Sequence, residues 1–204
     1  MVCAKCKEWE LPIMDCQGCS ECYTEIVNQA SREDVNAIGG DDGYTPLTQA
    51  IDTRSAEAIE ILLSHPDIDI NKPDGRGLHP VFYAVGDCDI LRVLIEERHA
   101  NTSVRSQEDG NSILHQAVEY AHVDSVCYLI ERGCPIDNRN NHEETPLLLA
   151  MKNDQYQVIP TLLENGADVN AVNRCGHYLN LFLSALLWIS PNPSDWNVQL
   201  ERER

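Results

Sequence analysis

Basic residues are scarce in this 204-residue sequence. It has 15 lysines and arginines against 33 aspartates and glutamates, and its formal net charge is −18 at pH 7. Such a charge is repelled by the phosphate backbone of nucleic acids and by anionic membrane surfaces. We therefore expect neither nucleic acid nor a membrane as a partner, and a basic protein segment is favoured.

Long apolar runs are also missing. The longest, residues 181–189, is interrupted by Ser184 and is far shorter than the ~20 residues that span a bilayer. Residues 1–20 carry Lys5, Glu8, Glu10 and Asp15, and they lack the apolar core of a signal peptide. The sequence therefore predicts a protein of the cytoplasm, the nucleus or both.

The sequence contains no recognisable catalytic constellation. Its histidines are scattered without the His-x-x-x-His spacing of a metal site. Gly39-Gly40 and Gly75-x-Gly77 are isolated turn glycines, which do not make a phosphate-binding loop. The cysteines beyond residue 80 are dispersed, as expected for small apolar fillers. We predict that the protein is not an enzyme.

What the sequence does contain is a repeat. The pattern Thr145-Pro146-Leu147-Leu148-Leu149-Ala150 has earlier copies that end at Ala50, Ala84 and Ala117, so the final alanines lie 34, 33 and 33 residues apart. A serine or threonine can cap a helix, and a proline suits the first helical position. Each copy therefore predicts the start of a helix, and the alanine one turn later predicts close contact with a neighbouring helix.

A second apolar set with helical spacing follows about nine residues after each alanine. The sets are Ile59/Leu62/Leu63, Leu91/Leu94/Ile95, Val126/Leu129/Ile130 and Ile159/Leu162/Leu163. Gly133 and Gly166 are typical of helix ends. Asp42-Gly43, Asp74-Gly75 and Asp109-Gly110 are typical of hairpin turns. Each unit is therefore predicted to be two helices followed by a hairpin.

A Thr-Pro-Leu-His-x-Ala motif at a period of about 33 residues is the signature of ankyrin repeats, and the chain resembles this family from about Thr24 to Leu187. The resemblance implies an all-α fold, a solenoid of stacked helix-turn-helix units with short hairpin loops. We predict a cysteine-rich segment over 1–22, an ankyrin repeat domain over 23–189 and a tail over 190–204. The second repeat, with two extra residues and Gly86, should be the least regular, and Pro160 should bend or delay its helix.

The family resemblance also implies a function, because ankyrin arrays usually bind other proteins through the hairpin tips and the concave side of the inner helices. Carried over to this sequence, the binding residues are Asp41, Asp42, Tyr44, Asp52, Glu108, Asp109, Glu119, Tyr120, His142 and Glu144. Carboxylates predominate in this set, so we predict a non-enzymatic interaction module that binds a basic segment, with Tyr44 and Tyr120 as aromatic anchors. His115 occupies a position that the family often uses for hydrogen bonds between adjacent repeats.

Five of the nine cysteines lie within the first 22 residues. Two Cys-x-x-Cys pairs, Cys3/Cys6 and Cys16/Cys19, can together supply four thiolates to a structural zinc ion, with Cys22 as an alternative ligand. Reduced thiols without a metal are the competing interpretation, and redox or iron-sulfur chemistry is a third.

Two other functions stay open at this point. The chain can be the substrate-recognition adaptor of a ubiquitin ligase, although no C-terminal box for that role is recognisable over 190–204, or a zinc-dependent or redox regulator that works through its N-terminal cysteines. Asn170, eight residues after Leu162, is similar to asparagines that an oxygenase hydroxylates in other ankyrin repeats. We therefore predict Asn170 as a candidate hydroxylation site.

Overall fold

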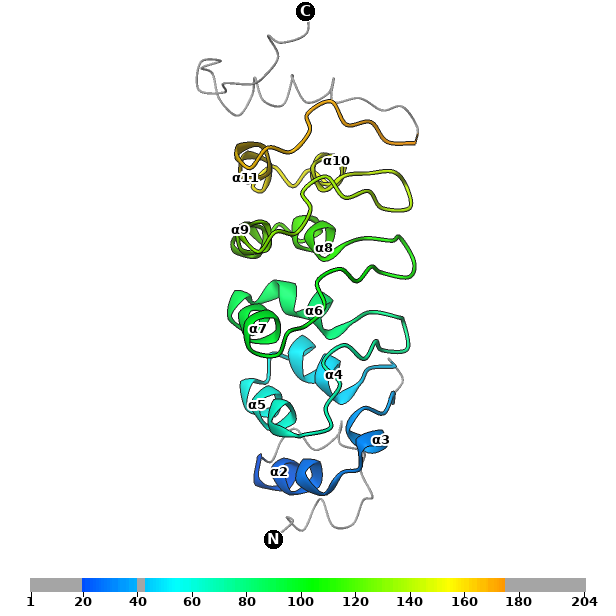
Figure 1. Cartoon of the computed structure of the whole chain (residues 1–204), viewed down its shortest axis with the longest axis vertical. Coiled ribbons are helices and arrows are strands. Elements are labelled where there is room, and N and C mark those ends of the chain that lie inside the picture. Colours follow the sequence, from blue (N-terminus) through cyan, green and yellow to red (C-terminus); the bar gives the residue numbers. More distant parts are fainter. Residues whose placement is uncertain (1–19, 40–42, 175–204) are drawn as a thin grey trace, which may run out of the picture.

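The computed structural model describes residues 20–39 and 43–174, and the regular secondary structure within them is helical. Pairs of helices stack along one axis, and hairpin loops project from one side of the stack (Figure 1). The helical elements are α2 (Ser20–Gln29), α3 (Arg32–Val35), α4 (Pro46–Asp52), α5 (Ala56–Ser64), α6 (Pro80–Tyr83), η2 (Ala84–Gly86), α7 (Cys88–Arg92), η3 (Val93–Glu97), α8 (Ile113–Glu119), α9 (Val123–Glu131), α10 (Pro146–Lys152) and α11 (Ile159–Glu164).

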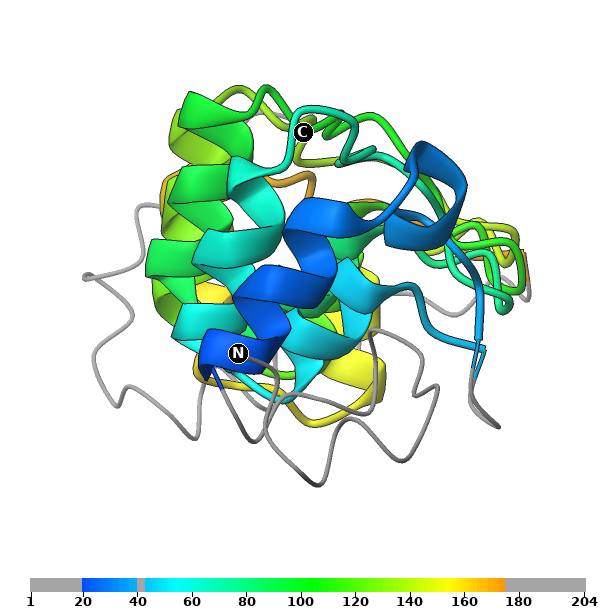
Figure 2. The same ribbon diagram turned by 90° about the horizontal axis from the view of Figure 1, so that it is seen from below.

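Each repeat contributes one helix to each of two rows. Helices α4, α6, α8 and α10 form an inner row beside the hairpins, and α5, α7, α9 and α11 form an outer row (Figures 1 and 2). We number the pairs repeats 1 to 4, from α4/α5 to α10/α11. The predicted all-α solenoid is confirmed.

The inner helices begin where the repeated motif predicts. The hydroxyl oxygens of Thr45, Ser112 and Thr145 each accept a hydrogen bond from the backbone N–H three residues later, at 3.2, 3.4 and 3.3 Å. The motif alanines, Ala50, Ala84, Ala117 and Ala150, are all fully buried. A larger side chain at these positions would separate neighbouring helices.

The outer helices bury the predicted apolar sets only in part. The first two members of every set are buried, but Ile95, Ile130 and Leu163 are partly exposed, whereas Leu63 is buried. In these three outer helices the third member therefore lies at the edge of the buried stripe. The sequence period predicts the stripe correctly but not its width.

Glycines end two of the outer helices, α9 and α11, and turn the first three hairpins through left-handed backbone. Gly133 and Gly166 have φ angles of 81° and 87°, as predicted for helix ends. In the second hairpin the left-handed residue is Gly77 and not Gly75, because the two extra residues move the turn. In the fourth hairpin Glu143 takes this conformation, with φ of 60°.

Repeat 2 is the irregular unit, as predicted. Its inner helix α6 has four residues and continues as the short 3-10 turn η2, and Asp87 then caps α7 by accepting from two backbone N–H groups. Leu91 and Ala100 are nine residues apart, whereas their equivalents in repeat 3, Val126 and Cys134, are eight apart. The extra residue is absorbed by the π-helical segment η3, as single insertions in helices commonly are.

A cap can be restored in repeat 2. His79 stands where the other inner helices have Ser or Thr, makes no side-chain cap bond, and its Nδ1 atom is buried without a hydrogen-bond partner among the described residues. The N–H of Phe82 already donates to the His79 carbonyl at 2.9 Å, so a hydroxyl at position 79 would share this hydrogen. We therefore expect His79→Thr to raise the free energy of unfolding by less than about 1 kcal/mol. Urea unfolding beside His79→Ala, which cannot cap, checks this. Equal stability of the two variants would contradict it.

The described part of the array begins with half a repeat, and a proline shapes its last outer helix. Helix α2 packs against α5 and buries Tyr23 and Val27, so it lies where an outer helix of a preceding repeat would lie. Helix α11 starts at Ile159, three residues later than its equivalent α9, with Pro160 in its first turn. This delay is the effect that Pro160 predicts.

Side chains in the loops that leave the outer helices tie neighbouring repeats together. Side-chain oxygens of Asn36, Asn71 and Asp137 accept hydrogen bonds from backbone N–H groups in the next such loop, at 2.7, 2.8 and 3.0 Å. The equivalent donor position between repeats 2 and 3 is Pro135, which has no N–H. This tie is therefore missing at that one boundary within the described array.

Candidate functional site

We call the surface formed by the inner helices and the adjacent hairpins the inner face. It is the surface that the family resemblance predicts to bind partners. Each repeat can place there one side chain just before the helix cap and another at the end of the inner helix. In repeat 1 Tyr44 donates its hydroxyl hydrogen to Asp52 Oδ2 at 3.2 Å, and in repeat 4 Lys152 Nζ lies 3.0 Å from Glu144 Oε1. The equivalent pair in repeat 3 is Asn111 and Glu119.

Glu144 is not the exposed carboxylate that the sequence predicts. Glu144 is only 4% exposed, and its two carboxylate oxygens accept hydrogen bonds from Lys152 and from Asn140 Nδ2. Asn140 also donates to Asn111 Oδ1 of the preceding repeat at 2.9 Å. Glu144 is therefore neutralised within the array, and its role is to hold the base of the fourth hairpin.

Asp109 and His142 come together at the hairpin tips. His142 Nε2 lies 3.3 Å from Asp109 Oδ1, and both side chains are at least half exposed. The backbone of the two hairpins is also joined, because the N–H of Asn141 donates to the Asp109 carbonyl at 2.8 Å. The neighbouring Glu108 is exposed. These residues form a continuous polar edge across repeats 3 and 4.

Glu119 is a partly buried carboxylate of the inner face, and its pKa is raised. Partial burial raises its pKa above the usual value, the negative charge of Asp109 raises it further, and Lys152 opposes both effects. Next to it Tyr120 is 61% exposed, and its ring centroid lies 6.2 Å from that of His122. A cation placed beside Glu119 and Asp109 would be stabilised by both carboxylates.

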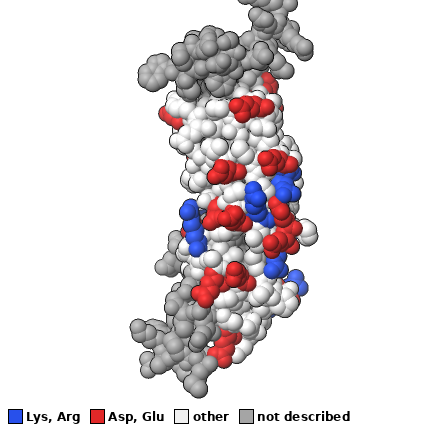
Figure 3. All heavy atoms as spheres, turned by 90° about the vertical axis from the view of Figure 1, so that its left-hand side faces the viewer, with Lys and Arg blue, Asp and Glu red and all other residues white. Residues whose placement is uncertain are grey.

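Acidic side chains are not confined to the inner face. Figure 3 shows the side of the outer helices, where carboxylates are spread along the whole array and Lys and Arg side chains gather near its middle. The inner face also carries positive groups, Arg76 and Lys152. The net charge is therefore distributed around the molecule, and any selectivity of the inner face depends on particular residues. Asp41 and Asp42 lie outside the described residues.

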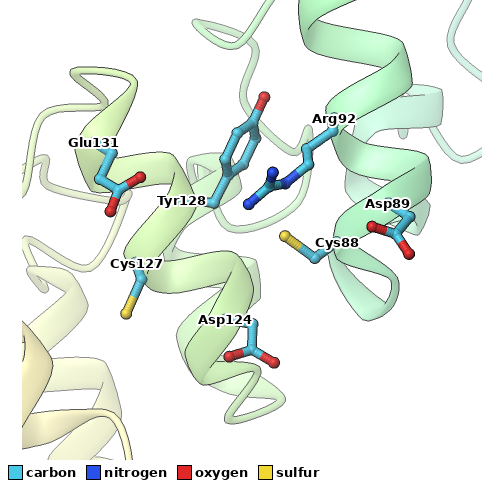
Figure 4. A pocket seen from close by; sticks show the side chains of 7 residues that line it. All are labelled: Cys88, Asp89, Arg92, Asp124, Cys127, Tyr128 and Glu131. Carbon is cyan, nitrogen blue, oxygen red and sulfur yellow. The ribbon is translucent and has the colours of Figure 1, made fainter.

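A pocket of about 520 Å³ opens between α7 and α9 on the outer side (Figure 4). Its lining residues are Cys88, Asp89, Arg92, Asp124, Cys127, Tyr128 and Glu131. The guanidinium carbons of Arg92 and Arg132 each lie 5.2 Å from the ring centroid of Tyr128, whose hydroxyl donates to Glu96 at 3.1 Å. No histidine lines this pocket to pair with either thiol. The sequence did not indicate the pocket.

The predicted zinc ligands Cys3, Cys6, Cys16, Cys19 and Cys22 have no described side chains, so the zinc site stays a prediction. Among the residues that are described, no group of three or more His, Cys, Asp or Glu side chains could hold a metal ion. Within the same part of the chain, no helix has the length and apolar character needed to cross a membrane.

Asn170 is exposed in the loop after α11, and its N–H donates to Asp168 Oδ1 at 2.9 Å. The leucine of the same motif, Leu162, is fully buried. An oxygenase that must contact this leucine would require local opening of repeat 4. Hydroxylation of Asn170 stays a prediction.

The sequence could have indicated the burial of Glu144. Glu144 and Lys152 carry opposite charges eight residues apart, at the two positions that Tyr44 and Asp52 occupy in repeat 1. That spacing was the available signal. By contrast, the contact between Asp109 and His142 joins residues 33 apart and depends on how neighbouring hairpins stack.

Known proteins show the same repeat. A family profile of ankyrin repeats in three copies matches residues 78–173. Human rabankyrin-5 is 30% identical over 136 residues, which is 65% of this chain and 12% of that protein. Human SMC5-SMC6 complex localization factor protein 1 is 33% identical over 125 residues, 60% of this chain and 11% of that protein. The chain thus spans about an eighth of the length of these relatives.

Proposed function

The chain is an ankyrin-repeat protein, a class whose repeats are protein-protein interaction modules, and we propose that its inner face binds a basic segment of a partner protein. The observation that carries this proposal is the environment of Glu119. Burial and the charge of Asp109 raise the pKa of Glu119, while Lys152 opposes both effects, so the two carboxylates repel each other in the free protein. A lysine or arginine of a partner would relieve this repulsion.

Further residues support the same surface. Asp52 and Glu108 add exposed carboxylates, and Tyr44 and Tyr120 offer aromatic rings of the kind that contribute strongly to interfaces. Ankyrin repeats are generally non-enzymatic, and the described residues give a binding surface a better basis than a catalytic one. One relative, the SMC5-SMC6 complex localization factor protein 1, is likewise named for the localization of a complex.

Charge reversal on the inner face tests the proposal. We expect Asp52→Lys/Asp109→Lys/Glu119→Lys to bind a fluorescent oligolysine peptide at least about tenfold more weakly than the wild type, because attraction at the contact becomes repulsion. The measurement is fluorescence anisotropy at moderate salt, with circular dichroism to verify folding.

The matched control is Glu60→Lys/Glu131→Lys/Glu164→Lys. It changes the net charge by the same amount at exposed positions of α5, α9 and α11. The control should bind much more tightly than the inner-face variant. Equal losses in the two variants would mean that only the overall charge attracts the peptide, and the proposed site would be wrong.

A further inference from the structure

The guanidinium of Arg76, a residue of the same chain, lies over the Tyr44 ring. The guanidinium carbon of Arg76, from the next hairpin, lies 4.8 Å from the Tyr44 ring centroid. On another side of the same ring, Tyr83 packs edge-on, with centroids 5.6 Å apart and planes at 72°. The Tyr44 hydroxyl bonds Asp52 at 3.2 Å. One aromatic ring therefore holds the cation, and a second ring and a carboxylate contact that ring.

The walls of this corner are fixed independently of the Arg76 side chain. Tyr83 donates its hydroxyl hydrogen to Asp74 Oδ2 at 2.6 Å, and Asp74 is only 4% exposed. Asp74 Oδ1 in turn accepts from the backbone N–H groups of Arg76 and Leu78, at 2.9 and 2.8 Å. The hairpin backbone and the Tyr83 ring are thus held in place, whereas Arg76 itself is exposed.

We propose that Tyr44, Tyr83 and Asp52 form a binding site for the arginine side chain of a partner, and that Arg76 occupies this site until the partner displaces it. The inference rests on the proposed function, since it names the chemistry that one part of the inner face recognises. A planar guanidinium can stack on the Tyr44 ring while it bonds the Asp52 carboxylate, and an ammonium offers no such stacking. Arginine is therefore preferred to lysine at this position.

Removal of the internal competitor tests the proposal. Arg76→Ala should bind a fluorescent oligoarginine peptide about two- to fivefold more tightly than Arg98→Ala, because a cation-π contact of ordinary strength no longer has to be broken. Arg98→Ala is the matched control: it removes the same charge from an exposed position at the end of η3. An oligolysine peptide of equal length should gain less. Tyr44→Leu in the Arg76→Ala background should abolish the gain.

The outcomes separate this inference from the function on which it rests. Arg76→Ala that binds oligoarginine no more tightly than Arg98→Ala would overturn the displacement, and so would a gain that survives Tyr44→Leu. If the wild type binds and is weakened by reversal of Asp109 and Glu119, the proposed function stands in either case. If no variant binds either peptide, both proposals fail together.

Discussion

Replacement of His115 by leucine should lower the free energy of unfolding by about 3 kcal/mol. His115 is fully buried in α8, and its Nε2 lies 3.0 Å from the Glu144 carbonyl of the next repeat. Its Nδ1 lies 3.2 Å from the Ser112 backbone nitrogen. Leucine fills similar space but leaves the buried Ser112 N–H without its partner, at about 1–3 kcal/mol. It also removes one of the two hydrogen bonds to the Glu144 carbonyl, which keeps the bond from the Asn140 N–H at 3.0 Å, and such a lost bond costs about 1 kcal/mol. Urea unfolding measures the loss, and the exposed His142→Leu should lose much less.

The same side chain makes stability depend on pH. A carbonyl only accepts, so Nε2 of His115 carries the hydrogen and Nδ1 accepts from Ser112; the neutral ring fits this arrangement. Burial lowers the pKa of His115 below 6.5, and the nearby Arg105 also lowers it. Above pH 6.5 the ring is neutral in both the folded and the unfolded state. As the pH falls below 6.5, the unfolded chain binds the proton first, and stability is lost.

Wild-type stability should therefore fall over this range more steeply than that of His115→Leu. Parallel curves would contradict the assignment. His79, whose pKa is also lowered by burial, contributes a slope that both proteins share.

Removal of the Lys152 ammonium should cost about 2 kcal/mol of stability. In Lys152→Met the Glu144 carboxylate keeps its buried position, with a side chain 5% exposed, but loses the only cation that binds it among the described residues. A buried charge without its partner typically costs 3–5 kcal/mol, and the exposure of Lys152 reduces this figure. Thermal or urea unfolding checks the loss, with Lys72→Met as the control for loss of a lysine elsewhere.

A second substitution makes the Lys152 prediction specific. Glu144→Gln in the Lys152→Met background removes the stranded charge and keeps an oxygen for Asn140, so the double variant should recover most of the lost stability. A double variant that is no more stable than Lys152→Met would show that the ion pair does not hold the fourth hairpin.

The features that recur in every repeat are the ones that the sequence predicts well. The period, the Ser or Thr caps, the buried alanines and the apolar stripes of the outer helices are local patterns, and each is found in the structure at its predicted place. His115 also bridges adjacent repeats as the family resemblance implies. These features are readable because each depends on residues within one repeat, or on a position that every repeat shares.

Features that depend on the neighbour of a particular repeat could not be predicted in the same way. The Asp109–His142 contact joins residues from different hairpins, so it depends on the stacking of two units. The turn at Gly77 and the π-helical segment η3 follow from insertions, and the chain can absorb an insertion in several ways. The predicted set of exposed carboxylates on the inner face is too large for a related reason, because it includes the buried Glu144. Sequence position identifies which carboxylates are on a face, but not that Lys152 neutralises Glu144.

Pro135 changes how repeats 2 and 3 are joined. The arginine site around Tyr44 belongs to repeats 1 and 2, and the carboxylates of Asp109 and Glu119 belong to repeat 3. Between these halves one backbone tie is missing, and on the opposite side the same boundary is hollowed by the pocket between α7 and α9. Side chains join the two halves there instead, because Ser125 Oγ donates to the Val85 carbonyl at 2.6 Å and the Tyr128 hydroxyl donates to Glu96 at 3.1 Å. A long basic ligand that engages both halves would therefore depend on these side-chain contacts to keep the two parts of its binding surface in register.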